Sequence, residues 1–231
     1  MSTVAFVPIK LNNERVPGKN LKPMDDGKVL ISFILDTLLE VKDKKVVDDV
    51  VVYCSTAKIC EYLPRSVKWI RRPETLDTQS TKSNDIIRSF LDDYEADIYV
   101  MCHATSPFMQ ALHIEECVNA VKSGEYDSAF CANEIRNFLW QNREPLNFSR
   151  DNYPRTQDLI PIYEELPTPY VFSKEVFERT RGRTGTNPYI CACSAVEAID
   201  IDNPDDFILA NAIHMAGIDK LGDKYGYTID G

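Results

Sequence analysis

The first polar segment of the chain is poor in glycine. Positions 7–20 read VPIKLNNERVPGKN and contain one glycine, Gly18. Neither the GxGxxG fingerprint of dinucleotide-binding folds nor the GxxxxGK[ST] phosphate loop is therefore present. The segment instead follows an apolar strand and carries Lys10, Arg15 and Lys19, which predicts anion binding by side chains at the carboxyl edge of a sheet. Taken alone, a short basic cluster is more typical of a solvated turn.

Positive charge is also scarce in the chain as a whole. Lys and Arg number 26 against 36 Asp and Glu, which gives a formal net charge of −10. An acidic protein repels a phosphate backbone, and no basic stripe with interleaved aromatic residues offsets that repulsion, so we expect no nucleic-acid partner. No apolar signal core opens the sequence, and no apolar run approaches membrane-spanning length. We therefore expect a cytoplasmic protein with no membrane partner.

The seven cysteines do not form a paired framework. Most of them lie in apolar stretches, which predicts buried thiols in a reducing compartment. Cys191-Ala192-Cys193 could be half of a metal site, but no second Cys or His pair stands at zinc spacing. We therefore favour two core residues on one face of a strand. For His113 and His214 we predict no function.

Apolar periodicity predicts strands that alternate with helices along the chain. No internal repeat or linker divides the sequence, so we expect one domain over residues 1–231. Regular alternation of this kind predicts an α/β fold, with a mostly parallel sheet and helices on both faces. The expected strands are 3–9, 49–54, 67–71, 97–102 and 127–132, and the expected helices are 30–41, 84–94 and 113–122.

The region from about 133 to 170 breaks this alternation. It contains Trp140, Phe148, Tyr153 and Tyr163, and four prolines fall within its last seventeen residues. These features predict an irregular or antiparallel excursion. Loops this long in compact domains are usually functional. The alternative is a disordered surface insertion, which so many aromatic residues disfavour.

Two aspartates near the end of the chain could bind a cation. Asp200 and Asp202 lie two positions apart, on what we expect to be the end of a strand. Both carboxylates would then project to the same side and could share one hard cation such as Mg²⁺. An Asp-x-Asp pair alone is more often a cap or turn feature.

Four ordered blocks resemble the acylneuraminate cytidylyltransferases, or CMP-sialic acid synthetases, and more distantly the Kdo cytidylyltransferases. The resemblance spans nearly the whole chain and implies a Rossmann-like, nucleotidyltransferase-like fold. The blocks are Lys19-Asn20-Leu21-Lys22-Pro23; Arg72-Pro73 with Leu76 and Ser83-Asn84-Asp85; His103-Ala104-Thr105-Ser106-Pro107-Phe108; and Ala198 to Phe207, which reads AIDIDNPDDF.

This resemblance implies a Mg²⁺-dependent enzyme that transfers CMP from CTP to an anionic acceptor and releases pyrophosphate. The implied acceptor is a nonulosonic or related ulosonic acid used for surface glycan assembly. The 133–170 region is implied to be an arm that pairs two subunits of a homodimer. By residue, the resemblance implies catalytic roles for Lys10, Lys19 and Asp202; nucleotide binding by Lys10, Asn13, Lys19, Asn20, Arg72 and Ser83; acceptor binding by His103, Thr105, Ser106, Arg155 and Gln157; and Mg²⁺ binding by Asp200 and Asp202.

Several positions depart from the family pattern. His103 stands where the family has Gln, and Leu166-Pro167 replaces an Asn-Gly pair ahead of a strand. We therefore expect sialic acid to be a poor substrate, with a phosphonate or another non-sugar acid as an alternative acceptor. Further replacements are Lys10 for Arg, Asn13 for Ser, Glu14 for Lys and Met109 for Arg.

Two hypotheses of other classes stay open at this point. A non-catalytic nucleotide-binding regulator would account for the replacements in the first loop. A glycosyltransferase would account for the Asp-x-Asp pair, although such a pair normally ends a middle strand. Individual residues also have plainer alternatives, such as Ser83 acting only as a helix N-cap.

Overall fold

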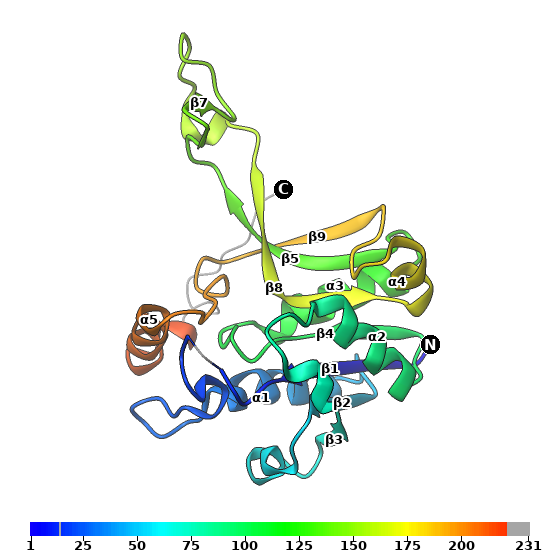
Figure 1. Cartoon of the computed structure of the whole chain (residues 1–231). Helices are drawn as coiled ribbons and strands as arrows, with labels where there is room; N and C mark the ends of the chain where they lie inside the picture. Colours follow the sequence, from blue (N-terminus) through cyan, green and yellow to red (C-terminus); the bar gives the residue numbers. More distant parts are fainter. Residues whose placement is uncertain (14, 221–231) are drawn as a thin grey trace.

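The computed structural model describes residues 1–13 and 15–220 of the chain, so the replacement at Glu14 lies outside the described residues. Seven strands form one sheet in the order β3-β2-β1-β4-β8-β5-β9 (Figure 1). All neighbours are parallel except β8, which runs antiparallel to both β4 and β5. The strands are β1 (Thr3–Ile9), β2 (Asp49–Cys54), β3 (Lys68–Arg71), β4 (Ile98–Met101), β5 (Ser128–Ile135), β8 (Ile162–Phe172) and β9 (Pro188–Cys193).

Helices cover both faces of this sheet, as alternate residues of β1 show. Val7 points into a buried cluster with residues of α1 and α3. Phe6 points the opposite way and stacks on Phe90 of α2, with ring centroids 4.1 Å apart, in a cluster that also contains Phe177 of α4. The predicted α/β fold is therefore confirmed. The helices are α1 (Leu30–Asp43), α2 (Ser83–Asp93), α3 (Ala111–Lys122), α4 (Lys174–Thr180) and α5 (Pro204–Met215), with 3-10 turns η1 (Lys19–Leu21), η2 (Ala57–Tyr62), η3 (Glu74–Asp77), η4 (Thr156–Asp158) and η5 (Ile218–Lys220).

The segment between β5 and β8 forms an arm. Its base is antiparallel pairing of residues 132–135 with 162–165, and it carries a small hairpin of β6 (Trp140–Gln141) and β7 (Glu144–Pro145). Figure 1 shows the arm projecting from the body of the molecule, with β7 towards its far end. Aromatic rings hold it together, because Phe148 contacts Phe138, Trp140 and Tyr153 at centroid distances of 4.9 to 5.4 Å.

The parallel strands bring several loops to one edge of the sheet. Six strands, β1, β2, β3, β4, β5 and β9, share one direction. The segments after Ile9, Cys54, Arg71, Met101 and Cys193 therefore all leave from the carboxyl ends of these strands.

Among residues 1–13 and 15–220, no helix has the length and apolar character needed to cross a membrane.

Candidate functional site

Cations of the first loop meet the second aspartate of the Asp-x-Asp pair. Lys19, in η1, places its Nζ 2.7 Å from the carbonyl oxygen of Ile201 and 3.3 Å from Oδ1 of Asp202. Arg15 donates to both carboxylate oxygens of Asp202, at 3.1 Å each. Residues 187 positions apart in sequence therefore form one charged site at the carboxyl edge of the sheet.

The Asp-x-Asp segment is not part of a strand. Residues 199–202 belong to no element, so the expected strand end is wrong. Two contacts hold the segment in place instead: Ile201 is fully buried against α5, and its backbone N donates to the carbonyl of Thr105 at 2.9 Å. The charges of Asp202 and Lys19 both act on the Asp200 carboxyl, so the two carboxylates lie near each other and near Lys19.

Asp200 has the features of a cation ligand. Burial raises the pKa of its carboxyl group and the charge of Asp202 adds to this, while a hydrogen bond from Thr105 opposes it. Its Oδ1 is buried and has no hydrogen-bond partner among the described residues. A divalent cation would balance the charge of the buried carboxylate and would give its unpaired oxygen a partner, so these residues fit Mg²⁺. Among the described residues, no group of three His, Cys, Asp or Glu ligands includes this pair, which suits an ion that also binds water and substrate phosphates.

Two amides of the first loop have different surroundings. Asn20 is buried, and its Nδ2 donates to the carbonyl of Lys10 at 2.9 Å, so it fixes the path of the loop. Asn13 has a buried Oδ1 with no hydrogen-bond partner in the described structure. Of the two, Asn13 thus offers an unused acceptor, whereas the amide nitrogen of Asn20 is already engaged.

Arg72 follows β3 and is enclosed by protein. Its guanidinium is 1% exposed and forms an ion pair with Asp77, which also accepts a hydrogen bond from Ser55 at 2.6 Å. The Nε atom of Arg72 lacks a partner among the described residues. The pair Arg72 and Asp77 therefore shapes the loop after β3, and only part of the guanidinium is satisfied by protein.

Ser83 is the first residue of α2, and Lys82 is the N-cap, so the interpretation of Ser83 as an N-cap is wrong. Asp85 caps this end instead by accepting from the backbone N of Lys82 at 3.0 Å. The hydroxyl of Ser83 is free to accept from Nη1 of Arg183 at 3.2 Å.

His103 is a neutral imidazole with a defined orientation. Its Nδ1 lies 2.6 Å from the carbonyl oxygen of Pro167, and its backbone N donates to Oγ1 of Thr168 at 2.8 Å. Burial is the main cause that lowers the pKa of the ring to about 4; the hydrogen bond to the Pro167 carbonyl opposes the shift, and the positive charges of Arg183 and Lys19 add to it. A neutral ring that donates from Nδ1 leaves Nε2 as an acceptor.

Arg183 is a residue that the sequence patterns did not single out. Its guanidinium lies 3.5 Å from the ring centroid of Tyr170, donates to the Tyr170 hydroxyl at 2.7 Å and approaches Glu165 at 3.4 Å. Together with Ser83 it lines a surface hollow of about 390 Å³. The only sequence signal for it is the segment RGRTGT at 181–186, which concentrates Arg, Gly and Thr after α4.

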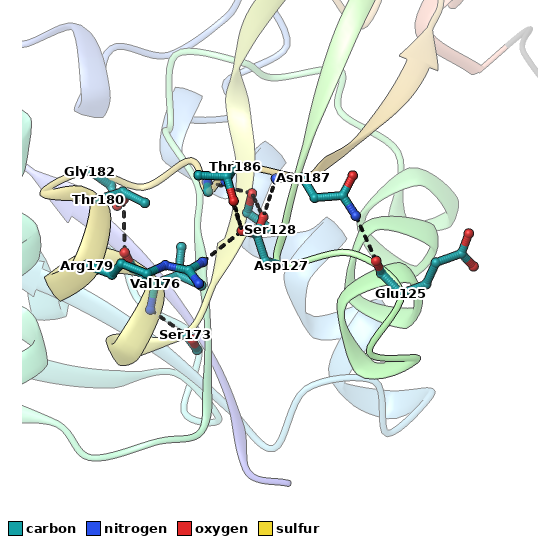
Figure 2. A network of polar contacts seen from close by, with 11 residues as sticks. Glu125, Asp127, Ser128, Ser173, Val176, Arg179, Thr180, Gly182, Thr186 and Asn187 are labelled. Carbon is teal, nitrogen blue, oxygen red and sulfur yellow. Dashed lines mark hydrogen bonds and ion pairs between the residues drawn. The ribbon is translucent and has the colours of Figure 1, made fainter.

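The loop that presents Arg183 is fixed by Asp127, the residue immediately before β5. Figure 2 shows the Asp127 carboxylate surrounded by donors from Arg179, Thr186 and Asn187. Ser128 joins this network by donating to Asp127 at 3.2 Å. These bonds tie both ends of the 181–187 loop to one strand end, so the position of Arg183 depends on a carboxylate outside the site.

The acceptor residues predicted from sequence do not all come together. Thr105 lies at the Asp200 carboxylate, and Ser106 is buried with an Oγ that has no partner in the described structure. Arg155 and Gln157 lie in the arm, where Arg155 is ion-paired with Asp158 and its side chain is 77% exposed. The structure therefore does not bring these two residues to the site of their own chain.

The replacement at Leu166-Pro167 also has a different setting from the expected one. These residues lie inside β8, at a bulge opposite Cys131, and not ahead of a strand. Leu166 is 3% exposed and packs in the core cluster under α1 and α3. It does not line the site, whereas the carbonyl of Pro167 does contribute by orienting His103.

Residues 4–200 match the family model described as cytidylyltransferase. The chain is 26% identical over 221 residues to the N-acylneuraminate cytidylyltransferase of Streptococcus agalactiae serotype V, which covers 90% of this chain and 52% of that protein. It is 27% identical over 216 residues to N-acylneuraminate cytidylyltransferase A of Danio rerio. That match covers 89% of this chain and 49% of the Danio rerio protein. The chain thus spans about half the length of these curated relatives.

Solved structures share the fold. CMP:2-keto-3-deoxy-manno-octonic acid synthetase in complex with CTP superposes with a TM-score of 0.69 at 17% identity, over 94% of this chain and 99% of that one. The 4-diphosphocytidyl-2C-methyl-D-erythritol synthase of Anaerococcus prevotii gives a TM-score of 0.64 at 14% identity, over 93% of this chain and 96% of that one. The nucleotidyltransferase-like architecture is therefore common to these proteins.

Proposed function

The chain belongs to the cytidylyltransferase family, and on this basis we propose that it transfers CMP from CTP to an anionic small-molecule acceptor and releases pyrophosphate. The observation that carries the proposal is the meeting of Lys19 and Arg15 with Asp202 at the carboxyl edge of the sheet. Attack on an α-phosphate brings negative charges together, so such a site needs fixed cations beside carboxylates that can hold a metal ion.

Lys19 is the cation best placed to act on the triphosphate. Its side chain is only 12% exposed, and the Ile201 carbonyl at 2.7 Å holds its ammonium in place. A cation fixed before the substrate arrives needs little reorganisation when charge develops on the phosphate oxygens. The Arg15 side chain is 64% exposed, so its ion pair with Asp202 contributes little to stability. Arg15 can therefore leave Asp202 and bind phosphate at a small cost in free energy.

Asp200 and Asp202 would hold Mg²⁺ in this proposal. When bound, the ion would neutralise charge on the phosphates and help to keep the attacking and leaving oxygens in line. The chain's own contribution is to hold the segment that carries both carboxylates in place, through the burial of Ile201 and its bond to Thr105.

The acceptor would bind beside His103 and Arg183. The unprotonated Nε2 of His103 can accept a hydrogen bond from the attacking hydroxyl, because Nδ1 is held by the carbonyl of Pro167. Arg183 supplies a cation for an acidic group on the acceptor. We propose a nonulosonic or ulosonic acid as the acceptor, with a phosphonate as the alternative, since a charged anchor suits both.

The active unit is proposed to be a homodimer. Arg155 and Gln157 lie on the arm, away from the site of their own chain, so they can serve acceptor binding only in a second copy. The arm also exposes large apolar side chains, with Trp140 at 52%, Tyr153 at 57% and Ile160 at 83%. An apolar surface of this kind is typical of an interface.

Pyrophosphate release tests the proposal. The protein is incubated with CTP, Mg²⁺ and a panel of acidic sugars and phosphonates, and UTP and ATP serve as controls for the base. We expect release with CTP that depends on one class of acceptor. CTP binding without release under any condition would favour the non-catalytic regulator, and transfer from a preformed sugar nucleotide without CTP would favour a glycosyltransferase.

A further inference from the structure

A cluster of thiols lies under α3, away from the nucleotide site. Cys117 of α3 and Cys131 of β5 place their sulfur atoms 3.8 Å apart. Cys191 of β9 joins them, and the ligand atoms of all three lie within 4.8 Å of one another. All three side chains are at most 1% exposed. Four of the seven cysteines meet here, because Cys193 lies beside Cys191 on the same face of β9.

The fold explains why these residues converge. Cys131 and Cys191 are direct partners in the parallel register of β5 and β9. Cys117 and His113 are four residues apart on α3, so they share the helix face that packs on these strands. His113, Cys191 and Cys193 form a second group whose ligand atoms lie within 4.8 Å of one another. Cys191 belongs to both groups.

A buried carboxylate holds the histidine that lies beside the sulfurs. Glu197 is 1% exposed, and its Oε1 lies 2.6 Å from Nδ1 of His113. The rest of that carboxylate is satisfied by the backbone N atoms of Gln110 and Ser194 and by the Ser194 hydroxyl, at 3.0 to 3.2 Å. With Nδ1 engaged, Nε2 is the ligand atom that His113 can offer. This carboxylate and histidine arrangement is the one that supports metal-bound imidazoles.

We propose that Cys117, Cys131 and Cys191 bind a thiophilic metal ion, Zn²⁺ in the first instance, with His113 or Cys193 as the fourth ligand. A tetrahedral zinc site with bonds of about 2.3 Å has sulfur atoms about 3.8 Å apart, as Cys117 and Cys131 are. Glu197 also accepts from Gln110 and Ser194, and its contact with His113 adds the carboxylate partner that a zinc-bound imidazole uses. Because every thiolate donor is enclosed, the ion would be structural and would join α3 to the β5 and β9 edge of the sheet.

Metal content decides whether the site exists. The full chain is purified without chelator from zinc-supplemented cells, and bound metal is measured by mass spectrometry. We expect about one zinc per chain and, after exchange, a cadmium thiolate charge-transfer band in the near ultraviolet. A folded wild-type protein with less than about a tenth of an equivalent, and no band after refolding with Cd²⁺, would overturn the proposal.

Variants decide where the ion lies. Cys191→Ala should lose the metal, whereas Cys54→Ala, another buried strand thiol outside the cluster, should keep it. Asp202→Asn should also keep it, which separates this site from the nucleotide site. If Cys191→Ala does not fold, Glu197→Gln serves instead, with an expected fall in zinc affinity of about 10- to 100-fold. Equal zinc content in Cys191→Ala and wild type would place the ion elsewhere and refute the assignment.

Discussion

Arg15 and Asp202 form a two-point ion pair that joins the first loop to the Asp-x-Asp segment 187 residues later. Their side chains are 64% and 40% exposed, so the pair contributes at most about 1 kcal/mol to folding. A weak pair of this kind can exchange partners readily. In the proposed enzyme, Asp202 would turn to the metal ion and Arg15 to the triphosphate without a change of fold.

Asp202→Asn tests that exchange. The substitution keeps the size of the side chain and removes one charge from the proposed metal site, so kcat should fall by about 100-fold or more. The melting temperature should change little, because the amide oxygen of the substituted side chain can still accept from Arg15 and Lys19, and Lys19 also keeps the Ile201 carbonyl as a partner. Pyrophosphate release is measured over a Mg²⁺ titration, with Asp205→Asn, an exposed aspartate in the first turn of α5, as the matched control. Normal turnover at saturating Mg²⁺ would remove Asp202 from the metal site.

Lys19→Ala separates a catalytic role from simple binding. Loss of a preorganised cation that stabilises charge on the phosphates should lower kcat by about 10²- to 10³-fold. Lys22→Ala is the control, because the Lys22 ammonium lies over the Phe207 ring, 4.1 Å from its centroid, and not at Asp202. A rise in the KM for CTP with unchanged kcat would show that Lys19 contributes uniform binding only.

Gly185→Ala tests whether Asp127 positions Arg183. A Cβ at Gly185 would lie 2.1 Å from Oδ1 of Asp127, so the carboxylate must move and the network of Figure 2 must loosen. We expect a loss of about 1 to 3 kcal/mol in the free energy of unfolding, and a higher KM for the acceptor than for CTP. Gly182→Ala, in the same loop, meets no atom within 4 Å and should be neutral. Equal behaviour of the two variants would contradict the positioning role.

The pKa of His103 predicts a pH dependence of stability. Burial holds the folded-state pKa at about 4, below the ordinary value of 6.5. Between these two pH values the imidazole is protonated in the unfolded chain and neutral in the folded chain. The free energy of unfolding therefore falls as the pH drops from 6.5 to 4. His103→Gln, compared by urea unfolding at several pH values, should lose less stability over that window. An unchanged slope would show that the ring is not held neutral.

The sequence predicts those features that depend on neighbouring residues, and it misses contacts between residues that lie far apart along the chain. Strands β1 to β5 were predictable because each is short and contains apolar, β-branched or aromatic residues, whereas β8 was hidden by Pro167 and Pro169 within it. The first loop and the aspartates could be named from the order of their motifs. Arg183 could not, since its partner Ser83 is 100 residues away. The thiol cluster was missed for the same reason, because its members come from three elements and show no zinc spacing.

The arm should determine both the assembly and the completeness of the site. Sedimentation of the wild-type protein should show a dimer, and Ile160→Asp should weaken it by placing an unpaired carboxylate in the interface. Leu112→Asp is the control, because Leu112 is 58% exposed but lies on α3 in the body of the molecule. A monomeric wild type, or equal weakening by both changes, would contradict a dimer made through the arm.

Mixed dimers then show whether Arg155 works in the neighbouring subunit. Asp202→Asn and Arg155→Ala chains are each expected to be poorly active, the first through the metal site and the second through the acceptor site. If the arm delivers Arg155 to the partner, a mixed dimer contains one site with both Asp202 and Arg155 intact. Random exchange of equal amounts should then restore about a quarter of wild-type activity. Without such crossing, each chain keeps its own defect, and mixing should restore none.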